Sequence, residues 1–282
     1  MAIGQQSSLA DPDGDPDGAD GSPAMTTPTR ASRRRRRRDA EQSLGSWLLE
    51  LVLIAVIALL ISSLIRNFVL QMFLVPSGSM ENTLQVNDRV AVVEVTDIHR
   101  GDVVVFHDPG HWLGPGEQTS NPVRKIVEFL GVMPSAPTDH LVKRVIGMPG
   151  DHVVCCDMSG QLTVNGVALN ERSYLYSVNG VSVNPSDQRF DVVVPAGHIF
   201  VMGDHRNASK DSRAHLCDDV APGQVPGAAG FVPLADVTGP GVAIAMPFNR
   251  IQRLTIPSTF ASIPPPAEPA PPDPIINVRP CG

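Results

Sequence analysis

The chain has 282 residues, of which 42% are hydrophobic and 18% charged, with 27 prolines and 24 glycines. So many turn-forming residues argue against a helical bundle and favour short segments joined by loops. The net charge of −7 excludes a chain that is basic throughout, as a nucleic-acid-binding protein would be.

Residues 1–43 form a turn-rich N-terminal segment that contains a run of arginines. The segment is rich in Asp, Gly, Pro and Ser, so it cannot bury enough apolar surface to offset the entropy lost on ordering. We expect it to be a disordered tail. The run Arg33–Arg38 fits a solvated tail or a nucleic-acid patch, and the apolar residues that follow decide between the two.

Residues 44–66 predict a single transmembrane helix. From Trp47 to Ile65 the only charged residue is Glu50, and about 19 residues at about 1.5 Å each match the thickness of the hydrocarbon core. A buried core helix would carry a polar stripe, and a cleaved secretory signal would be shorter and begin earlier. Because arginines precede the helix, we expect a cytoplasmic N-terminus and an extracytoplasmic location for everything after Arg66. The predicted location is the plasma membrane, with one pass.

Residues 67–256 predict an antiparallel β domain. Short runs of β-branched residues are bounded by Gly, Pro, Asn or Asp, and Asn165-Gly166 within one of them is a strong hairpin signal. Because no long helix separates the runs, the fold class is mainly β. Phe68–Leu74 is expected to be a strand or an interfacial segment that rests on the lipid. The runs are RVAVVEV (89–95), DVVVFH (102–107), HLVKRVIG (140–147), HVVCC (152–156), LTVNGVAL (162–169), FDVVV (190–194) and HIFVMG (198–203).

Two segments are expected to lie outside the regular sheet. Residues 107–140 predict an inserted loop with a short amphipathic helix over 122–131, which begins at a proline and has four apolar residues on one face. Packing on the domain and lying on the membrane surface are both open for this helix. The Pro-rich segment 257–282 is expected to be an extended, mobile tail.

The cysteines predict a disulfide in an outward-facing domain, where oxidation is permitted. Adjacent cysteines rarely pair with each other, so we expect a bond from Cys155 or Cys156 to Cys217. Cys281 is the fourth cysteine. Zinc is the alternative, but the chain has no pair of cysteines or histidines at ligand spacing. No metal or other cofactor is predicted.

A serine and a lysine are the candidate catalytic residues. Ser79 lies in Pro76-Ser77-Gly78-Ser79-Met80, where glycine allows a sharp turn and close approach of a substrate. None of the eight histidines has the sequence context of a catalytic triad. A lysine can serve as the base only if burial lowers its pKa, since about one lysine in 2,500 is neutral at pH 7.

Lys143 fits this requirement because it lies in an apolar run without an adjacent carboxylate. Strand alternation places Lys143 and Arg144 on opposite faces, so we expect one to point inward and the other to reach solvent. The alternative for each residue is ordinary: a serine in a loop and a solvated lysine in a strand.

Four segments together resemble the type I signal peptidase family, peptidase family S26. FLVPSGSMENTL (73–84) resembles its nucleophile segment, and RGDVVVF (100–106) resembles the strand that follows. KRVIGMPGD (143–151) is similar to the segment that carries its lysine base, and GDHRNASKDSR (203–213) is similar to its last conserved segment. They occur in the family's order after an apolar segment, over about residues 47–250. The arginine-rich tail and the insertion look like actinobacterial members.

The resemblance implies a role for each residue of the site. Ser79 would be the nucleophile and Lys143 the general base. The hydroxyl of Ser77 and the backbone N–H of Ser79 would bind the oxyanion. Ser209 would hydrogen-bond Lys143, and Gly203 would leave room beside that lysine. The residues that match pocket positions of the family are Phe73, Val75, Pro76, Met80, Leu84, Leu141 and Val142.

The resemblance also implies a supporting network. Asp211 and Arg213 would form a structural ion pair, and Asp204 would belong to the same network. His205 departs from the family, which usually has Asn at this position. A second base and a substitution within a supporting loop are the two interpretations, and we favour the second.

The implied function is a membrane-bound serine endopeptidase that cleaves signal peptides from exported preproteins after small residues, in an Ala-x-Ala pattern. Its partners would be secretory preproteins, the lipid bilayer and the nearby export translocon, with no nucleic acid. LexA-like self-cleaving peptidases share the chemistry, but they are soluble and bind DNA. A membrane-tethered β domain that only binds export substrates is a non-enzymatic alternative, which intact Ser79 and Lys143 argue against.

Overall fold

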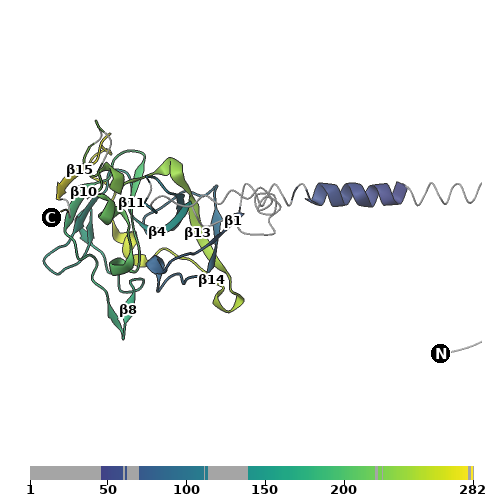
Figure 1. Ribbon diagram of the computed structural model, residues 1–282, viewed down its shortest axis with the longest axis horizontal. Helices are drawn as coiled ribbons and strands as arrows, with labels where there is room; N and C mark the ends of the chain where they lie inside the picture. The colour runs from purple at the N-terminus through teal and green to yellow at the C-terminus, as the bar shows by residue number, and fades with distance from the viewer. Residues whose placement is uncertain are drawn as a thin grey trace, which may run out of the picture. The chain divides into compact units, whose positions relative to one another are not determined.

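The computed structural model describes residues 46–59, 61, 70–110, 112–113, 139–219, 222–223, 225–278 and 281 (Figure 1). The chain divides into two units, residues 1–59 and residues 60–282, and each is described by itself. The predicted disordered tail, its arginine run and the predicted helix at 122–131 lie outside the described residues.

Residues 46–59 of the first unit form a helix whose apolar side chains are exposed. Within the described ranges, no helix has both the length and the apolar character needed to cross a bilayer. The transmembrane helix expected over residues 44–66 therefore stays a prediction. The exposed apolar side chains of this unit include Trp47, Leu48, Leu49, Leu51, Val52, Leu53, Ile54, Val56, Ile57 and Leu59.

The second unit is built on an eight-stranded antiparallel sheet. Seven of its strands follow one another in the order β1-β2-β13-β3-β4-β11-β12, and β14 pairs with β13. The predicted fold class, mainly antiparallel β, is confirmed. The strands are β1 (Leu70–Leu74), β2 (Arg89–Val93), β3 (Val103–His107), β4 (His140–Gly147), β11 (His198–Met202), β12 (Val232–Pro233), β13 (Val237–Met246) and β14 (Gln252–Arg253).

A smaller sheet and a hairpin complete the strands. The five-stranded sheet has the order β15-β10-β5-β6-β7, and β8 pairs only with β9. Asn165 and Gly166 both have positive φ, 52° and 79°, which is the conformation of the predicted two-residue hairpin turn. These strands are β5 (His152–Cys155), β6 (Thr163–Val164), β7 (Val167–Ala168), β8 (Ser177–Val178), β9 (Val181–Ser182), β10 (Phe190–Val193) and β15 (Ile275–Val278).

Short helical turns connect the strands. The single short α-helix of this unit among the described residues, α3, begins at Ser212 behind an Asp211 side chain that accepts a hydrogen bond from the Arg213 N–H, as an N-cap residue does. The 3₁₀ turns and the helix are η1 (Gly78–Met80), η2 (Arg206–Ala208), α3 (Ser212–His215), η3 (Ala228–Gly230), η4 (Leu234–Asp236), η5 (Phe248–Arg250) and η6 (Ser258–Ser262).

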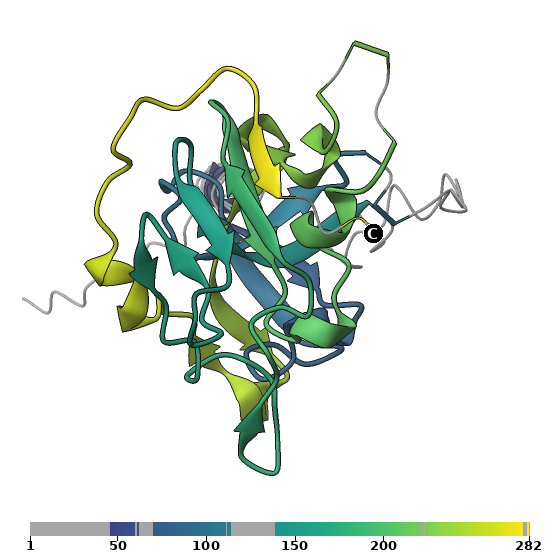
Figure 2. The same ribbon diagram turned by 90° about the vertical axis from the view of Figure 1, so that its left-hand side faces the viewer.

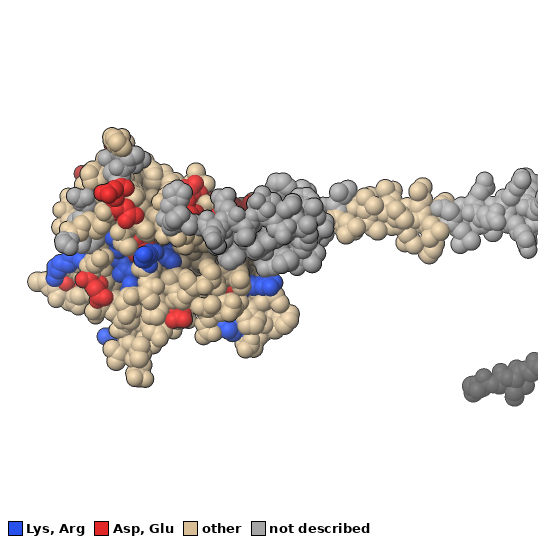
Figure 3. Space-filling view, in the orientation of Figure 1, with Lys and Arg blue, Asp and Glu red and all other residues tan. Residues whose placement is uncertain are grey.

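Strand β4 is the centre of the buried core. Its residues Val142, Val145 and Ile146 belong to three different apolar clusters, so both faces of the strand are covered. The expectation that Lys143 or Arg144 reaches solvent is therefore wrong: their exposed fractions are 3% and 2%. Much of the charge of this domain lies inside it, and uncharged side chains form most of the face shown in Figure 3.

The longest strand, β13, was not expected from the sequence, because Gly239-Pro240-Gly241 lies within it. Proline cannot donate a ladder hydrogen bond and usually argues against a central strand. Here β13 pairs with β3 as far as Pro240 and with β2 from Gly241 onward, and the register shifts on both sides of this change of partner. The glycine-proline segment thus lets one strand join two parts of the sheet.

The C-terminal segment is ordered, which corrects the expectation of a mobile tail over 257–282. Phe260 and Ile263 are buried in the largest apolar cluster. The segment then loops around the outside of the domain and ends in β15, which pairs with β10 (Figure 2). Prolines do not prevent this path, because an extended chain needs few backbone hydrogen bonds of its own.

Replacing Phe260 by alanine should lower the free energy of unfolding by about 3 kcal/mol, because the change leaves a cavity beneath the C-terminal segment. Phe260 is 5% exposed, and its ring stacks on that of Tyr174 at 6.0 Å between centroids. Urea unfolding measures the loss. Phe248→Ala is the matched control, since Phe248 is 77% exposed and its loss should change stability by less than about 0.5 kcal/mol. Equal effects of the two variants would contradict the docking of this segment.

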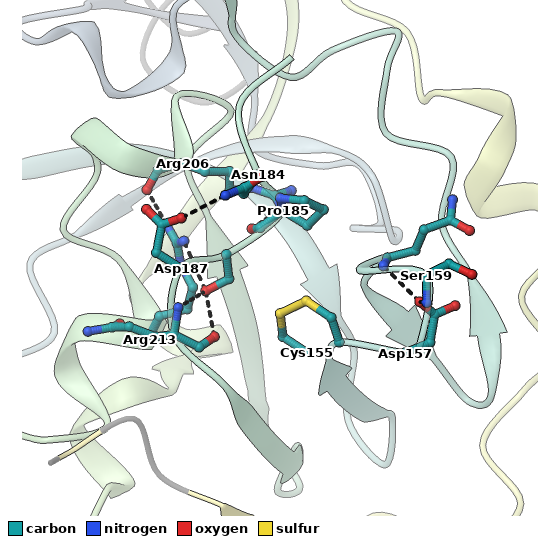
Figure 4. The surroundings of a disulfide bond; sticks show 12 residues. Cys155, Asp157, Ser159, Asn184, Pro185, Asp187, Arg206 and Arg213 are labelled. Carbon is teal, nitrogen blue, oxygen red and sulfur yellow. Dashed lines mark hydrogen bonds between the residues drawn. A yellow bond between two sulfur atoms is a disulfide. The ribbon is translucent and has the colours of Figure 1, made fainter. Parts of the chain in front are cut away.

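The disulfide pairing also differs from the expectation. Cys217 pairs with Cys281, at a Cα–Cα distance of 5.4 Å, and Cys155 pairs with Cys156. The ordered C-terminal segment brings Cys281 to the end of α3, so Cys217 has a nearer partner than β5 offers. The surroundings of Cys155 include the loop Asn184–Asp187 (Figure 4). No group of side chains suited to a metal ion occurs among the residues that the structure describes.

Candidate active site

The serine segment forms a turn that is anchored at both ends. The Val75 N–H donates to the Asp88 carbonyl at 2.9 Å, and the Asn87 N–H donates to the Val75 carbonyl at 2.9 Å. Between these anchors, Ser79 lies in η1 and Met80 is completely buried. Met80 packs into the apolar cluster and so fixes the turn against the core, where Ser79 is 7% exposed.

Lys143 reaches this turn from the middle of the sheet. Its strand β4 lies between β3 and β11, and Lys143 stands opposite Val104 of β3. The Nζ atom lies 2.7 Å from Ser79 Oγ and 3.1 Å from the Val142 carbonyl oxygen. The structure thus brings together two side chains that are 64 positions apart in the sequence.

Burial lowers the pKa of Lys143 to about 8. Desolvation is the largest cause, the charge of Arg213 adds to it, and the carboxylates of Asp211 and Asp204 oppose it. At that pKa about one lysine in ten is neutral at pH 7, far more than at the ordinary value. A neutral amine 2.7 Å from a hydroxyl can accept its proton.

The segment after β11 packs against the same turn. Strand β11 ends at Met202, opposite Arg144, so the chain leaves the sheet one residue from the position of Lys143. At Gly203 a Cβ atom would lie 2.5 Å from the Ser79 carbonyl oxygen and closer still to Ser209 Oγ. Only glycine therefore allows this approach, and the room it leaves is beside Ser79 and Ser209.

Ser209 does not make the bond that was expected. Its Oγ is buried and meets the geometric criteria for no hydrogen bond among the described residues, although it lies close enough to Asp211 to help lower the pKa of that carboxyl. Lys143 contacts Ser79 and Val142 instead. The Ser209 hydroxyl is nonetheless close to the turn that holds Ser79, because a Cβ atom at Gly203 would approach both Ser209 Oγ and the Ser79 carbonyl oxygen too closely.

The ion pair between Asp211 and Arg213 is present and buried. Arg213 Nε and Nη2 donate to the two carboxylate oxygens of Asp211, each at 2.8 Å. Burial by itself would raise the pKa of Asp211, but the charge and hydrogen bonds of Arg213 and the Gly203 N–H lower it. Because that N–H donates to Asp211 at 2.9 Å, the pair supports the segment that packs on Ser79.

Asp204, expected to belong to the supporting network, forms an ion pair with Arg144. Its carboxylate accepts two hydrogen bonds from Arg144, at 2.8 Å from Nε and 2.6 Å from Nη2. Thr83 donates to the same carboxylate at 2.5 Å. Arg144 also donates to the Gly101 carbonyl at 2.7 Å. The pair therefore ties the lysine strand to the serine turn and to the segment after β11.

Sequence reasoning missed a third buried pair in this region, between Arg206 and Glu171. Arg206 donates to Glu171 from Nη1 and Nη2, at 3.1 Å and 2.5 Å, and Tyr174 donates to Glu171 at 2.6 Å. Arg206 and Arg213 also donate to the loop Asn184–Asp187, whose dashed contacts are drawn in Figure 4. Arg206 lies in the segment GDHRNASKDSR (203–213), which could have indicated a supporting role, whereas nothing near Glu171 did.

The residues expected to line a pocket fall into three groups. Five share one buried apolar cluster, Pro76 is exposed, and Leu141 belongs to another cluster. Ser77 is exposed, with its Oγ 3.4 Å from Ser79 Oγ. A groove of about 440 Å³ lined in part by Thr83 and Arg144 does not include Ser79 or Lys143. The five clustered residues are Phe73, Val75, Met80, Leu84 and Val142.

Comparison with known proteins gives the family. Residues 48–246 match the family described as signal peptidase, peptidase S26. The signal peptidase I of Mycobacterium tuberculosis H37Rv is 36% identical over 266 residues, which cover 86% of this chain and 83% of the relative. The chain belongs to the signal peptidase family, peptidase S26. The resemblance stated from the four sequence segments is confirmed.

Other members of the signal peptidase family are similar over much of their length. A probable signal peptidase I of Mycobacterium leprae is 36% identical over 236 residues, covering 75% of this chain and 80% of the relative. A crystal structure of a signal peptidase I from Enterococcus faecalis V583 is 25% identical and covers 52% of this chain and 97% of that chain, with a TM-score of 0.31. Membership of this family makes the chain a signal peptidase I-type enzyme.

Proposed function

We propose that the chain is a serine endopeptidase in which Ser79 is the nucleophile and Lys143 the general base. The observation that carries this proposal is the 2.7 Å contact between Ser79 Oγ and a lysine amine that is almost completely buried. Burial keeps a useful fraction of the amine neutral, and the hydroxyl then donates its hydrogen to the nitrogen lone pair.

The reaction proceeds in two acyl-transfer steps. Ser79 Oγ attacks the scissile carbonyl carbon while its proton passes to Lys143 Nζ. The resulting ammonium gives that proton to the leaving amine, the peptide bond breaks and an ester forms on Ser79. Lys143 then takes a proton from water, whose oxygen attacks the ester carbonyl. The bond between that carbon and Ser79 Oγ breaks, the ammonium of Lys143 returns the proton to Oγ, and the acid product leaves.

Developing negative charge on the carbonyl oxygen requires hydrogen-bond donors near Ser79. The hydroxyl of Ser77 and the backbone N–H of Ser79 are the proposed donors, since Ser77 Oγ is exposed and 3.4 Å from Ser79 Oγ. Removing one such donor costs about 3 kcal/mol of transition-state stabilisation in other enzymes.

The substrate is the segment around the cleavage site of an exported preprotein, bound as an added strand beside Ser79. The apolar cluster next to the nucleophile, which includes Val75 and Val142, favours small apolar residues and an Ala-x-Ala pattern. The same apolar surroundings desolvate Lys143. Specificity and activation of the base therefore have one physical cause.

We place the enzyme at the plasma membrane through the apolar segment around residues 46–59, whose exposed side chains need a nonaqueous environment. The arginine run Arg33–Arg38 orients the N-terminus toward the cytoplasm. The catalytic domain then faces the side where preproteins emerge, near the export translocon. A reporter enzyme that is active only in the cytoplasm should be inactive when fused after residue 282, and activity there would contradict this orientation.

Trapping the acyl-enzyme tests the proposed function directly. The purified full chain is incubated in detergent with a preprotein, and the products are sequenced by mass spectrometry. A cut after Ala-x-Ala is expected, and a mechanism-based acylating inhibitor should modify the peptide that contains Ser79. Modification of a different residue, or products cut at unrelated positions, would contradict the nucleophile or the specificity, respectively.

Replacing Gly203 by alanine should lower kcat/KM by about 100-fold, because the new methyl group displaces the Ser79 carbonyl and a small misplacement of the nucleophile is costly. The Cβ would lie 2.5 Å from that oxygen. Gly110→Ala is the matched control, since its Cβ would meet no atom of the described residues within 4 Å. Preprotein cleavage measures both variants, and equal rates would show that the close packing at Gly203 does not position Ser79.

A further inference from the structure

His205 lies against the nucleophile turn on the side of the segment after β11. Its backbone N–H donates to the Ser79 carbonyl at 3.0 Å. The side chain is only 15% exposed, and its ring stacks on Tyr176 with 3.8 Å between centroids and 25° between planes. The imidazole is therefore held in one place by both its backbone and its ring.

The ring nitrogen Nδ1 faces two acceptors. It lies 3.2 Å from the Gly78 carbonyl oxygen and 3.1 Å from Glu81 Oε2. A carbonyl and a carboxylate can only accept hydrogen bonds, so Nδ1 must carry a proton. His205 thus donates to the residue before the nucleophile with its side chain, and to the nucleophile's own carbonyl with its backbone.

Neighbouring contacts hold both ends of this arrangement. A Cβ at Gly78 would lie 2.8 Å from Glu81 Oε1, so the Glu81 carboxylate rests on the bare face of that glycine. Asn82 donates to the Leu175 carbonyl at 3.1 Å, and the Tyr176 N–H donates to the Asp204 carbonyl at 3.1 Å. The turn, the Tyr176 segment and the His205 segment therefore hold one another in register.

We propose that His205 is a positioning residue for the reaction. By donating to Gly78 and stacking on Tyr176, it orients the Gly78–Ser79 peptide, whose N–H is a proposed oxyanion donor, and directs Ser79 Oγ at Lys143. It acts through the turn and exchanges no proton with the substrate, because the base is already in contact with Ser79. This inference rests on the proposed role of Ser79.

Three substitutions at this position separate positioning from simple structural support. Asn places an amide N–H where Nδ1 stands, Gln places it near the more distant Nε2 position, and Ala removes it. We expect His205→Ala and His205→Gln to lower kcat about tenfold or more, as loss of one such hydrogen bond allows, with KM within twofold. His205→Asn should retain kcat within about threefold. Each variant is assayed as the full chain in detergent on one preprotein, beside its thermal unfolding midpoint.

The pattern among the variants decides the outcome. Equal kcat values for the Asn and Gln variants, or wild-type kcat for the Ala variant, would overturn the proposal. If the Ala variant does not fold, the comparison of the Asn and Gln variants still tests the proposal. Ser79→Ala in the same assay shows whether cleavage depends on Ser79, so failure of the proposed function is recognised separately from failure at His205.

Discussion

Replacing Lys143 by methionine should lower kcat/KM for preprotein cleavage by about 10⁴-fold, because a chain of similar shape remains but the base is lost. Lys143 Nζ is the nitrogen 2.7 Å from Ser79 Oγ. Lys210→Met is the matched control, since Lys210 is exposed, and it should keep full activity. Retention of more than about 1% of wild-type activity by Lys143→Met would remove Lys143 from the catalytic role.

The pH dependence of the wild-type enzyme follows from the same amine. Since the base must be neutral and its pKa is about 8, kcat/KM should fall about tenfold for each pH unit below that value and level off above it. A profile that is flat between pH 6 and 9 would contradict a lysine base.

Lys143→Met should also stabilise the fold at neutral pH. The pKa of Lys143 is about 8 in the folded chain and 10.5 for an ordinary lysine, so the unfolded chain binds more protons between these values. Stability therefore rises with pH through this window, and charged Lys143 costs about 3 kcal/mol at pH 7. Urea unfolding should show Lys143→Met more stable than wild type at pH 7, and the difference should shrink as the pH approaches 10.5.

Removing Arg144 should have the opposite effect on the fold. Arg144→Met leaves the Asp204 carboxylate buried without its cation and should lower the free energy of unfolding by about 3–5 kcal/mol. The pair is buried on both sides, with two hydrogen bonds of 2.8 Å and 2.6 Å. Arg253→Met is the control, because Arg253 is exposed, and it should change stability by less than about 0.5 kcal/mol.

A double variant separates the lost contact from the unpaired charge. Arg144→Met with Asp204→Leu removes both charges, so it should recover much of the stability that Arg144→Met loses. Chemical unfolding of wild type, the two single variants and the double variant completes the cycle. If the double variant lost as much free energy of unfolding as the two single variants together, the two side chains would stabilise the fold independently, and their charges would not compensate each other.

Local sequence patterns predicted most of the strands but not their partners. Runs such as HLVKRVIG and HIFVMG are confirmed as β4 and β11, because β-branched residues between turn formers favour extended chain whatever their partner. The strand that contains Gly239-Pro240-Gly241 was missed. A sheet can include such a segment only where the strand changes its pairing from one neighbour to the other, and the sequence does not show that change. The ordered C-terminal segment was missed because burial of Phe260 and Ile263 outweighs its proline content.

The sequence by itself indicated the family, through four segments that resemble it, and the mainly β class, through short β-branched runs between turn formers. It also indicated the candidate serine and lysine, because these follow from residue types along the chain. Only the tertiary structure decided that Lys143 lies 2.7 Å from Ser79, that Arg144 pairs with Asp204 and that Cys217 pairs with Cys281. These contacts join residues 60 or more positions apart, and their existence depends on which strands become neighbours. Desolvation acts in the same way: an apolar run suggests a buried lysine, but the packing of three clusters around β4 is what lowers the pKa of its amine.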